Sequence, residues 1–296
     1  MTSIELKAHA KVNLFLKVLN KRSDSYHNIL TIFERISLCD KVKISKIPKG
    51  IVVSSDRFIT RHPKDNLAYK AARAILNNKR LNGGVKIRIR KIIPIGGGLG
   101  GGSSDAAAVL VGIDRLFNLK LKKKALMKLG GRLGADVPFF LSDAPFAIGR
   151  SRGDRLEVIR SKKRFWHLLV YPGFELSTKE VYEAFDRHLP KGLTRKRDGV
   201  KIPLPLVSST DFDAVESMLY NDLEDIARSK KDITDYIIKR LALRLGKKAI
   251  LSGSGPSLFC LYRTRKEAVK DQGLLFNSVA PRERKSWRVF IVKTEA

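Results

Sequence analysis

The most constraining feature of the sequence is a glycine-rich stretch from Pro94 to Ala108, which reads PIGGGLGGGSSDAAA. Apolar and basic residues alternate before it from 85 to 90, and apolar residues recur after it with helical spacing from 106 to 117. This pattern predicts a strand, a glycine loop and a helix, in that order. Glycine tolerates positive φ and carries no Cβ, and a helix N-terminus presents unpaired N–H groups. The stretch therefore predicts a backbone site for a bound polyphosphate, with Ser103 and Ser104 as caps or phosphate ligands.

Other phosphate-binding loops fit this stretch less well. A P-loop needs a lysine where Ser103 stands. A dinucleotide-binding fold needs an acidic residue on a second strand about 20 residues further on, and the region 118–126 contains none. The H-R-D signature of protein kinases is absent from the sequence. A flexible turn with serine caps is the structural alternative.

The composition indicates a folded globular protein with a large excess of positive charge. Hydrophobic residues make up 43% of the 296 residues, and 59 Lys and Arg against 29 Asp and Glu give a net charge of +30. Such a charge attracts polyanions, but the basic residues are spread along the whole chain without a known nucleic-acid-binding motif. Nucleic acid is therefore not expected to be the main partner.

The sequence also predicts a soluble, cytoplasmic protein. The amino terminus has no apolar signal region, and no run approaches the roughly 18 apolar residues of a membrane span. Cys39 and Cys260 are far apart in sequence and lack metal-ligand spacing, which favours reduced structural thiols.

The order of the predicted elements indicates two α+β domains, 1–160 and 161–296, with a site between them. The first half is rich in strands. On the best of these, Lys11 and Asn13 face the same side because side chains alternate along a strand. Asp136 stands just before a proline and two aromatic residues, where a turn or helix cap is the structural alternative to a functional carboxylate.

The second half mixes helices and strands. Helices are predicted at 122–133, 177–189 and 233–245, with a loop at 191–207 between the last two. A second, shorter glycine loop, SGSGP, spans 252–256 and lies between two strands. No internal repeat or low-complexity tract is present.

Three segments together resemble the motifs of the GHMP small-molecule kinases: AKVNLFL near the amino terminus, PIGGGLGGGSSDAA in the middle and SGSGPSLF near the end. The resemblance covers nearly the whole chain in matching order. It implies a two-domain α+β GHMP kinase fold with the active site in the interdomain cleft, built from an N-terminal ATP-binding domain and a C-terminal domain. The doubled glycine loop, a Tyr-His pair after a basic turn and the segment GADVPFF most resemble one branch of this family. That branch acts on a cytidine diphosphate derivative of methylerythritol in the non-mevalonate route to isoprenoids.

The resemblance also implies roles for individual residues. Lys11 and Asp136 match the catalytic residues of the family. The residues that match substrate contacts are Asn13, Tyr26, His27, Thr178 and Tyr182. The residues that match ATP contacts are Asn66, Lys91, Pro94, Ile95, Gly96, Gly97, Gly98, Leu99, Gly100, Gly101, Gly102, Ser103 and Ser104. The residues that match the motif supporting the phosphate site are Gly253, Ser254 and Gly255.

The implied reaction is transfer of the γ-phosphoryl group of ATP, with Mg²⁺, to the 2-hydroxyl of the methylerythritol part of the substrate. Asp136 is the implied general base, and Lys11 the group that stabilises the alkoxide. The implied setting is the cytoplasm, or the plastid stroma in a eukaryote, and the sequence leaves the oligomeric state and the metal ligands open. Ser25 stands where the family usually has glycine, and His9 where it usually has proline.

Two alternatives remain at this stage. A related GHMP kinase would act on homoserine, mevalonate or another small alcohol, and would not need a cytidine diphosphate group on its acceptor. A basic nucleic-acid-binding protein would use the glycine loop for backbone phosphate and would show a steep salt dependence of binding.

Overall fold

The computed structural model describes residues 2–79, 83–188, 212–282 and 284–295. The chain divides into two compact units, neither of which is continuous in sequence. Unit 1 comprises Met1–Ala10, Leu38–Ile95 and Gly100–Ala144, and unit 2 comprises Lys11–Ser37, Gly96–Leu99 and Pro145–Ala296.

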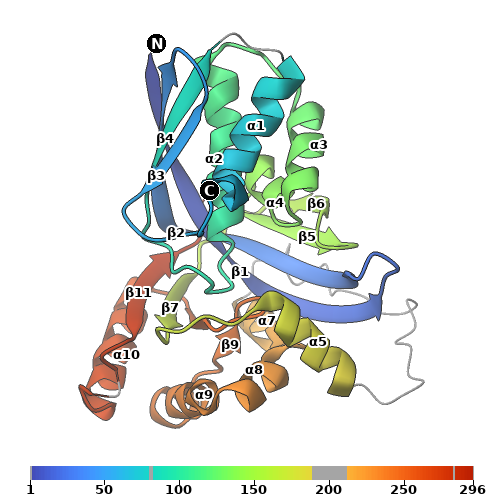
Figure 1. Cartoon of the computed structure of the whole chain (residues 1–296). Coiled ribbons are helices and arrows are strands. Elements are labelled where there is room, and N and C mark those ends of the chain that lie inside the picture. Colours follow the sequence, from blue (N-terminus) through green and yellow to red (C-terminus); the bar gives the residue numbers. More distant parts are fainter. Residues whose placement is uncertain (1, 80–82, 189–211, 283, 296) are drawn as a thin grey trace. The chain divides into compact units, whose positions relative to one another are not determined.

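Helices and strands alternate irregularly along the described residues, as expected of an α+β fold (Figure 1). In chain order the elements are β1 (Ser3–Lys21), β2 (His27–Ile47), β3 (Ile51–Ser55), η1 (Pro63–Asp65), α1 (Leu67–Lys79), β4 (Gly84–Arg90), α2 (Gly101–Leu116), α3 (Lys123–Leu133), α4 (Val137–Ser142), β5 (Phe146–Arg150), β6 (Arg155–Ile159), β7 (Trp166–Tyr171), α5 (Thr178–His188), α7 (Phe212–Met218), β8 (Tyr220–Asn221), α8 (Glu224–Lys230), α9 (Asp232–Leu245), β9 (Ile250–Leu251), β10 (Leu258–Tyr262), α10 (Arg265–Ser278) and β11 (Arg288–Lys293).

Unit 1 packs helices against one face of a sheet. β4 pairs antiparallel with the last part of β2 and parallel with β3. The helices α1, α2 and α3 lie on the same side of these strands (Figure 1). Ile44 and Ile87 from the strands and Ile75, Val109 and Ile113 from the helices belong to one buried cluster. The alternating pattern of β4 thus places its apolar residues in the core and its basic residues on the other face of the sheet.

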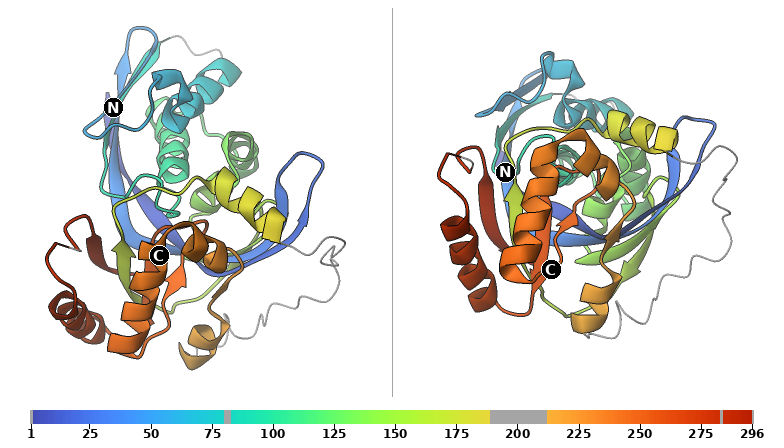
Figure 2. Two further views of the ribbon diagram at one scale, coloured as in Figure 1. Left: turned by 60° about the horizontal axis from the view of Figure 1, so that its bottom comes forward. Right: turned by 90° about the horizontal axis from the view of Figure 1, so that it is seen from below.

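Unit 2 contains a four-stranded sheet with the order β11-β7-β10-β9. Figure 2 shows α10 beside β11, with α9 next to α10. β5 pairs with the first part of β2 and with β6, and β8 adds a short parallel pairing to β1. A separate core cluster includes Leu168, Val170, Ile237 and Leu258, so each unit has its own hydrophobic core.

The structure confirms most elements that local periodicity predicts. α3, α5 and α9 lie at the predicted places, and β4, the glycine loop and α2 follow one another as expected. The predicted loop at 191–207 lies outside the described residues. The predicted boundary between 160 and 161 stays a prediction. No helix in the described ranges combines the length and the apolar content that crossing a bilayer requires.

Candidate active site

The glycine loop takes a conformation that requires glycine at three alternate positions. Gly96, Gly98 and Gly100 have φ values of 63°, 75° and 70°, in the left-handed region that side chains disfavour. Gly100 is the N-cap of α2, and the backbone N–H of Ser104 donates to its carbonyl at 2.9 Å. The loop therefore leads directly into the N-terminus of a helix 16 residues long, where unpaired N–H groups and the helix dipole favour an anion.

The three sequence motifs meet at Gly98 in unit 2. The carbonyl oxygen of Gly98 accepts hydrogen bonds from Lys11 Nζ at 2.9 Å and from Ser252 Oγ at 3.1 Å. A Cβ on Gly98 would lie 2.1 Å from the carbonyl oxygen of Ser252, and a Cβ on Gly253 would lie 3.2 Å from both the carbonyl oxygen of Gly98 and Lys11 Nζ. Close approach of the backbone is therefore the reason for glycine in both loops.

Lys11 and Asn13 are joined in a buried chain of hydrogen bonds. Lys11 Nζ donates to Asn13 Oδ1 at 2.5 Å, and Asn13 Nδ2 donates to Thr31 Oγ1 at 2.7 Å. Thr31 Oγ1 in turn donates to the carbonyl of Phe15 at 2.7 Å. Lys11 is 4% exposed and Asn13 1% exposed, so the ammonium group is desolvated and held in one position. The prediction that both residues face the same side of their strand is confirmed.

Asp136 lies in unit 1, at the N-cap of the short helix α4, and is partly buried. The turn that carries it is close to the start of α2, because a Cβ on Gly134 would lie 3.6 Å from Ser103 Oγ. Within unit 1, the Asp136 turn and the N-terminal end of α2 are thus neighbours.

Lys91 forms a buried cluster with two carboxylates that the sequence analysis did not anticipate. Its Nζ donates to Asp105 Oδ2 at 2.8 Å and also pairs with Asp40. Burial alone would lower the pKa of Lys91, but the charges of Asp105 and Asp40 outweigh it and raise that pKa. Burial raises the pKa of Asp105 to about 7, against the attraction of Lys91 and with the repulsion of Asp40.

This cluster contacts the first residue of α2 and the segment that precedes the glycine loop. A Cβ on Gly101 would be 3.3 Å from Lys91 Nζ. Asp40 Oδ1 accepts from the backbone N–H groups of Ile92 at 2.5 Å and Ile93 at 2.8 Å, in the segment that enters the loop. Asn66, another predicted ATP contact, caps α1 by accepting from the Ala68 N–H at 2.8 Å. In this structure both Lys91 and Asn66 support local structure, and their contact with ATP stays a prediction.

The predicted base-binding residues lie in unit 2. The rings of His27 and Tyr182 are stacked with centroids 4.9 Å apart, and His27 Nε2 lies 2.7 Å from Asp186 Oδ1. Tyr26 is 54% exposed, with the Arg152 guanidinium 5.0 Å from its ring centre. The structure thus gathers Tyr182 with His27, while the Tyr26 ring faces mostly solvent.

Thr178 at the start of α5 lies near the third motif. Its hydroxyl is 2.9 Å from the hydroxyl of Ser254. Asn221, a residue that the sequence analysis did not single out, donates to the carbonyl of Gly253 at 2.8 Å and to that of Leu251 at 2.7 Å. Asn221 is thus the side chain that fixes the backbone of the second glycine loop. It lies about 30 residues before that loop, in a segment without a recognisable motif, so no local signal could have identified it.

Comparisons with known proteins agree with this geometry. Residues 66–144 match the family model described as GHMP kinases N terminal domain, and residues 204–273 match GHMP kinases C terminal. The fold and the glycine loop are thus those of a GHMP kinase, a class of small-molecule kinases that use ATP.

The similar curated proteins narrow this class. The chain is 35% identical to 4-diphosphocytidyl-2-C-methyl-D-erythritol kinase of Syntrophus aciditrophicus (strain SB), over 98% of this chain and 99% of that protein. It is 39% identical to the protein of the same name from Pelobacter propionicus, over 90% and 92%. A crystal structure of 4-(cytidine 5'-diphospho)-2C-methyl-D-erythritol kinase superposes with a TM-score of 0.80 and 30% identity, covering 99% of this chain and 100% of the other. The chain belongs to the 4-diphosphocytidyl-2-C-methyl-D-erythritol kinase family.

A more distant structure shares the fold alone. Homoserine kinase from Cytophaga hutchinsonii superposes with a TM-score of 0.70 at 21% identity, covering 100% of this chain and 96% of the other.

Proposed function

We propose that this chain transfers the γ-phosphoryl group of ATP to the 2-hydroxyl of 4-diphosphocytidyl-2-C-methyl-D-erythritol, a step in non-mevalonate isoprenoid biosynthesis. The observation that carries the proposal is the meeting of Lys11, Gly98 and Gly253, which come from three motifs far apart in sequence. Phosphoryl transfer depends mainly on positioning and on neutralising charge in a loose transition state. Two glycine loops can position the phosphate chain, and the buried lysine between them can neutralise its charge.

ATP is proposed to bind along the glycine loop from Pro94 to Ser104, with Asn66 and Lys91 on the adenosine side. The positive φ of three glycines and the N-terminus of α2 fit a bound phosphate chain. Gly253, Ser254 and Gly255 are proposed to support that loop, since a Cβ on Gly98 would lie 3.0 Å from the backbone nitrogen of Gly255.

Mg²⁺ is proposed to enter with the nucleotide. Among the described residues there is no group of three or more His, Cys, Asp or Glu side chains that could hold a metal. This fits Mg²⁺, which usually keeps substrate phosphates and water as most of its ligands. When bound, the ion would neutralise charge on the phosphate chain.

Asp136 is proposed as the general base that accepts the proton of the substrate hydroxyl. An alcohol is a poor nucleophile, and a carboxylate next to the phosphate-binding end of α2 is suitably placed to activate it. Lys11 is proposed to stabilise the alkoxide as it forms, and Asn13 to contact the acceptor. The hydrogen bond from Lys11 fixes the Asn13 amide so that its Nδ2 points toward Thr31.

Tyr26, His27, Thr178 and Tyr182 are proposed as contacts of the cytidine diphosphate part. The stack of His27 on Tyr182 offers an aromatic surface for a base, and Thr178 is linked to the third motif through Ser254. We further propose that the reaction takes place in the cytoplasm, or in the plastid stroma in a eukaryotic cell.

The test is release of ADP from Mg-ATP by the purified protein with four acceptor conditions: the cytidyl substrate, homoserine, mevalonate and no acceptor. We expect release with the cytidyl substrate only. Release with homoserine or mevalonate would keep the kinase class but refute the base-pocket assignment. A parallel set with added RNA tests the nucleic-acid alternative.

Two variants test the catalytic residues in the same assay. Asp136→Asn should lower kcat by about two to four decades and leave ATP binding nearly unchanged, as expected for loss of a general base. Lys11→Ala should also lower kcat. Full activity of Asp136→Asn removes Asp136 from the mechanism, and weaker ATP binding at unchanged kcat would make Lys11 a binding residue instead.

A further inference from the structure

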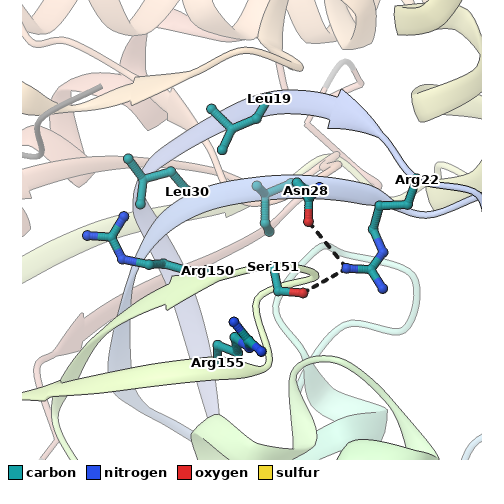
Figure 3. A pocket seen from close by; sticks show the side chains of 8 residues that line it. Leu19, Arg22, Asn28, Leu30, Arg150, Ser151 and Arg155 are labelled. Atoms are coloured by element: carbon teal, nitrogen blue, oxygen red, sulfur yellow. Dashed lines mark hydrogen bonds between the residues drawn. The ribbon is translucent and has the colours of Figure 1, made fainter. Parts of the chain in front are cut away.

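A hollow lined by three arginines lies in unit 2 beside the hairpin of β1 and β2 (Figure 3). Its volume of about 540 Å³ is in the range of small-molecule sites, roughly 300 to 1,000 Å³. Arg22 comes from the β1–β2 hairpin, and Arg150 and Arg155 come from the β5–β6 hairpin. None of the residues proposed above for ATP or for the cytidyl substrate lines this hollow.

The hollow is distinct from the proposed base-binding pocket. Asn28 lines the hollow, whereas His27 stacks on Tyr182. His27 and Asn28 are adjacent in β2, and adjacent side chains of a strand point to opposite faces of the sheet. Asn28 and Leu30 line the hollow from the face of β2 opposite His27, and Ile29 also lines it, whereas His27 and Tyr182 do not.

Arg22 is held in place at the rim of the hollow. Its NH1 donates to Ser151 Oγ at 2.9 Å and to Asn28 Oδ1 at 3.3 Å, as Figure 3 shows. Its Nε and NH2 donate to the carboxylate of Asp24, each at 3.0 Å. The guanidinium is thus oriented before any ligand arrives, which lowers the entropic cost of binding.

Arg150 and Arg155 place two positive charges opposite each other on paired strands. They are direct partners across the β5–β6 pairing, where like charges destabilise a sheet. Among the residues that the structure describes, neither guanidinium forms an ion pair or a side-chain hydrogen bond. An anionic ligand would remove this repulsion.

A like-charged pair across two strands is not sufficient by itself to indicate a site. Lys43 and Arg88 are also direct partners, in β2 and β4, and both are exposed. That pair does not line this hollow, so it serves as a matched control. What sets Arg150 and Arg155 apart is their place around the same hollow as Arg22.

We propose that this hollow binds a small diphosphate ester. Guanidinium groups pair with phosphate oxygens through two parallel hydrogen bonds, and Arg150 and Arg155 offer one guanidinium to each of two linked phosphate groups. Arg22 already pairs with Asp24, Asn28 and Ser151, so it adds at most one further N–H at the rim. Leu19 and Leu30 also line the hollow and provide an apolar surface for the organic part of the ester. The site is independent of the proposed kinase reaction.

The test is calorimetric titration of inorganic pyrophosphate into the full chain, with a non-hydrolysable ATP analogue saturating the glycine loop. We expect binding to persist under these conditions. The double variant Arg150→Ala, Arg155→Ala should weaken it by about 100-fold, since each charge-assisted contact contributes about tenfold. The control Lys43→Ala, Arg88→Ala removes the same charge and should change the dissociation constant less than about threefold.

Three outcomes would overturn the proposal. The first is complete loss of pyrophosphate binding when the ATP analogue is present, which would assign the binding to the glycine loop. The second is equal weakening of pyrophosphate binding in both double variants, which would show that binding depends on the net charge of the protein alone. The third is a short alkyl diphosphate that binds no more tightly than pyrophosphate. If the apolar surface takes part, the alkyl diphosphate should bind about tenfold more tightly. Melting curves of each variant, and the charge-conserving Arg150→Lys, Arg155→Lys pair, separate loss of the site from loss of the fold.

Discussion

The imidazole ring of His27 stacks on the phenol ring of Tyr182, with centroids 4.9 Å apart and planes inclined by 24°. Asp186, one turn further along α5, lies 2.7 Å from His27 Nε2 through its Oδ1. One helix therefore holds both the face and the edge of the ring. The contact at Nε2 and the stack on Tyr182 together fix the orientation of the buried His27 ring.

We predict that Asp186→Ala raises the KM for the cytidyl substrate by about tenfold, with little change in the KM for ATP or in kcat, because loss of a charged hydrogen bond frees the His27 ring. Asp186→Asn keeps an acceptor and should recover part of the loss. Lys21 pairs with the other carboxylate oxygen of Asp186, so Lys21→Ala is the control that leaves the His27 contact in place. Equal changes in both KM values would show that Asp186 is merely structural.

Gly98→Ala should abolish activity. The new Cβ would lie 2.1 Å from the carbonyl oxygen of Ser252, and a backbone atom cannot yield as a flexible side chain does. We expect at least a 100-fold loss of kcat/KM together with a lower melting temperature. Gly246 has a similar φ of 60° but open space around it, so Gly246→Ala isolates the cost of the left-handed backbone, about 1–2 kcal/mol. Activity retained in Gly98→Ala would show that the contact is not needed.

Ser25 has a φ of 65°, in the left-handed region where glycine carries no steric cost. Ser25→Gly should relieve about 1 kcal/mol of backbone strain and raise the melting temperature by about 2 °C, as expected for a chain of this size. Ser45, in the extended β2, is the control, since Ser45→Gly should lower the melting temperature. A fall in melting temperature on Ser25→Gly would contradict the strain argument.

The cluster around Lys91 should make stability depend on pH. The pKa of Asp105 is about 7 in the folded protein and ordinarily near 3.8, so the folded state binds the extra proton. Its contribution is complete below about pH 4 and is lost as the pH rises toward 7. We therefore expect the free energy of unfolding to fall between pH 4.5 and 8, and to fall less steeply in Asp105→Asn.

Denaturant unfolding at several pH values measures this dependence. Asp225, whose side chain is 94% exposed, provides the control substitution to Asn, which should leave the slope unchanged. The same slope in Asp105→Asn and in the unsubstituted protein would place the pH dependence elsewhere.

Local patterns predicted the elements that depend on neighbouring residues. Alternation identified β4 and helical spacing identified α2, because each pattern is written in adjacent residues. The pairing of Phe15 with Tyr220 was not predictable, since nothing local in either segment specifies a partner about 200 residues away. The same holds for Asp186 at His27 and for Asp40 at Lys91.

The candidate site divides in the same way. Resemblance to a family identified Lys11 and the two glycine loops. The glycines are recognisable because close backbone approach leaves no room for a side chain at these positions. The resemblance did not identify Thr31 or Asn221, which orient Asn13 and Gly253 through one hydrogen bond each. Such supporting side chains can be replaced by other donors or acceptors, so they leave no sequence motif.

The discontinuous units fix the order in which the protein can assemble during synthesis. All segments of unit 1 have left the ribosome soon after Ala144 is made, so this unit can fold early. Residues 11–37 belong to unit 2 and must wait for segments that run to the carboxyl terminus. Gly98 meets Ser252 only when most of the chain has been translated. A truncated nascent chain can therefore hold a folded unit 1 while Gly98 still lacks the contacts that shape the glycine loop.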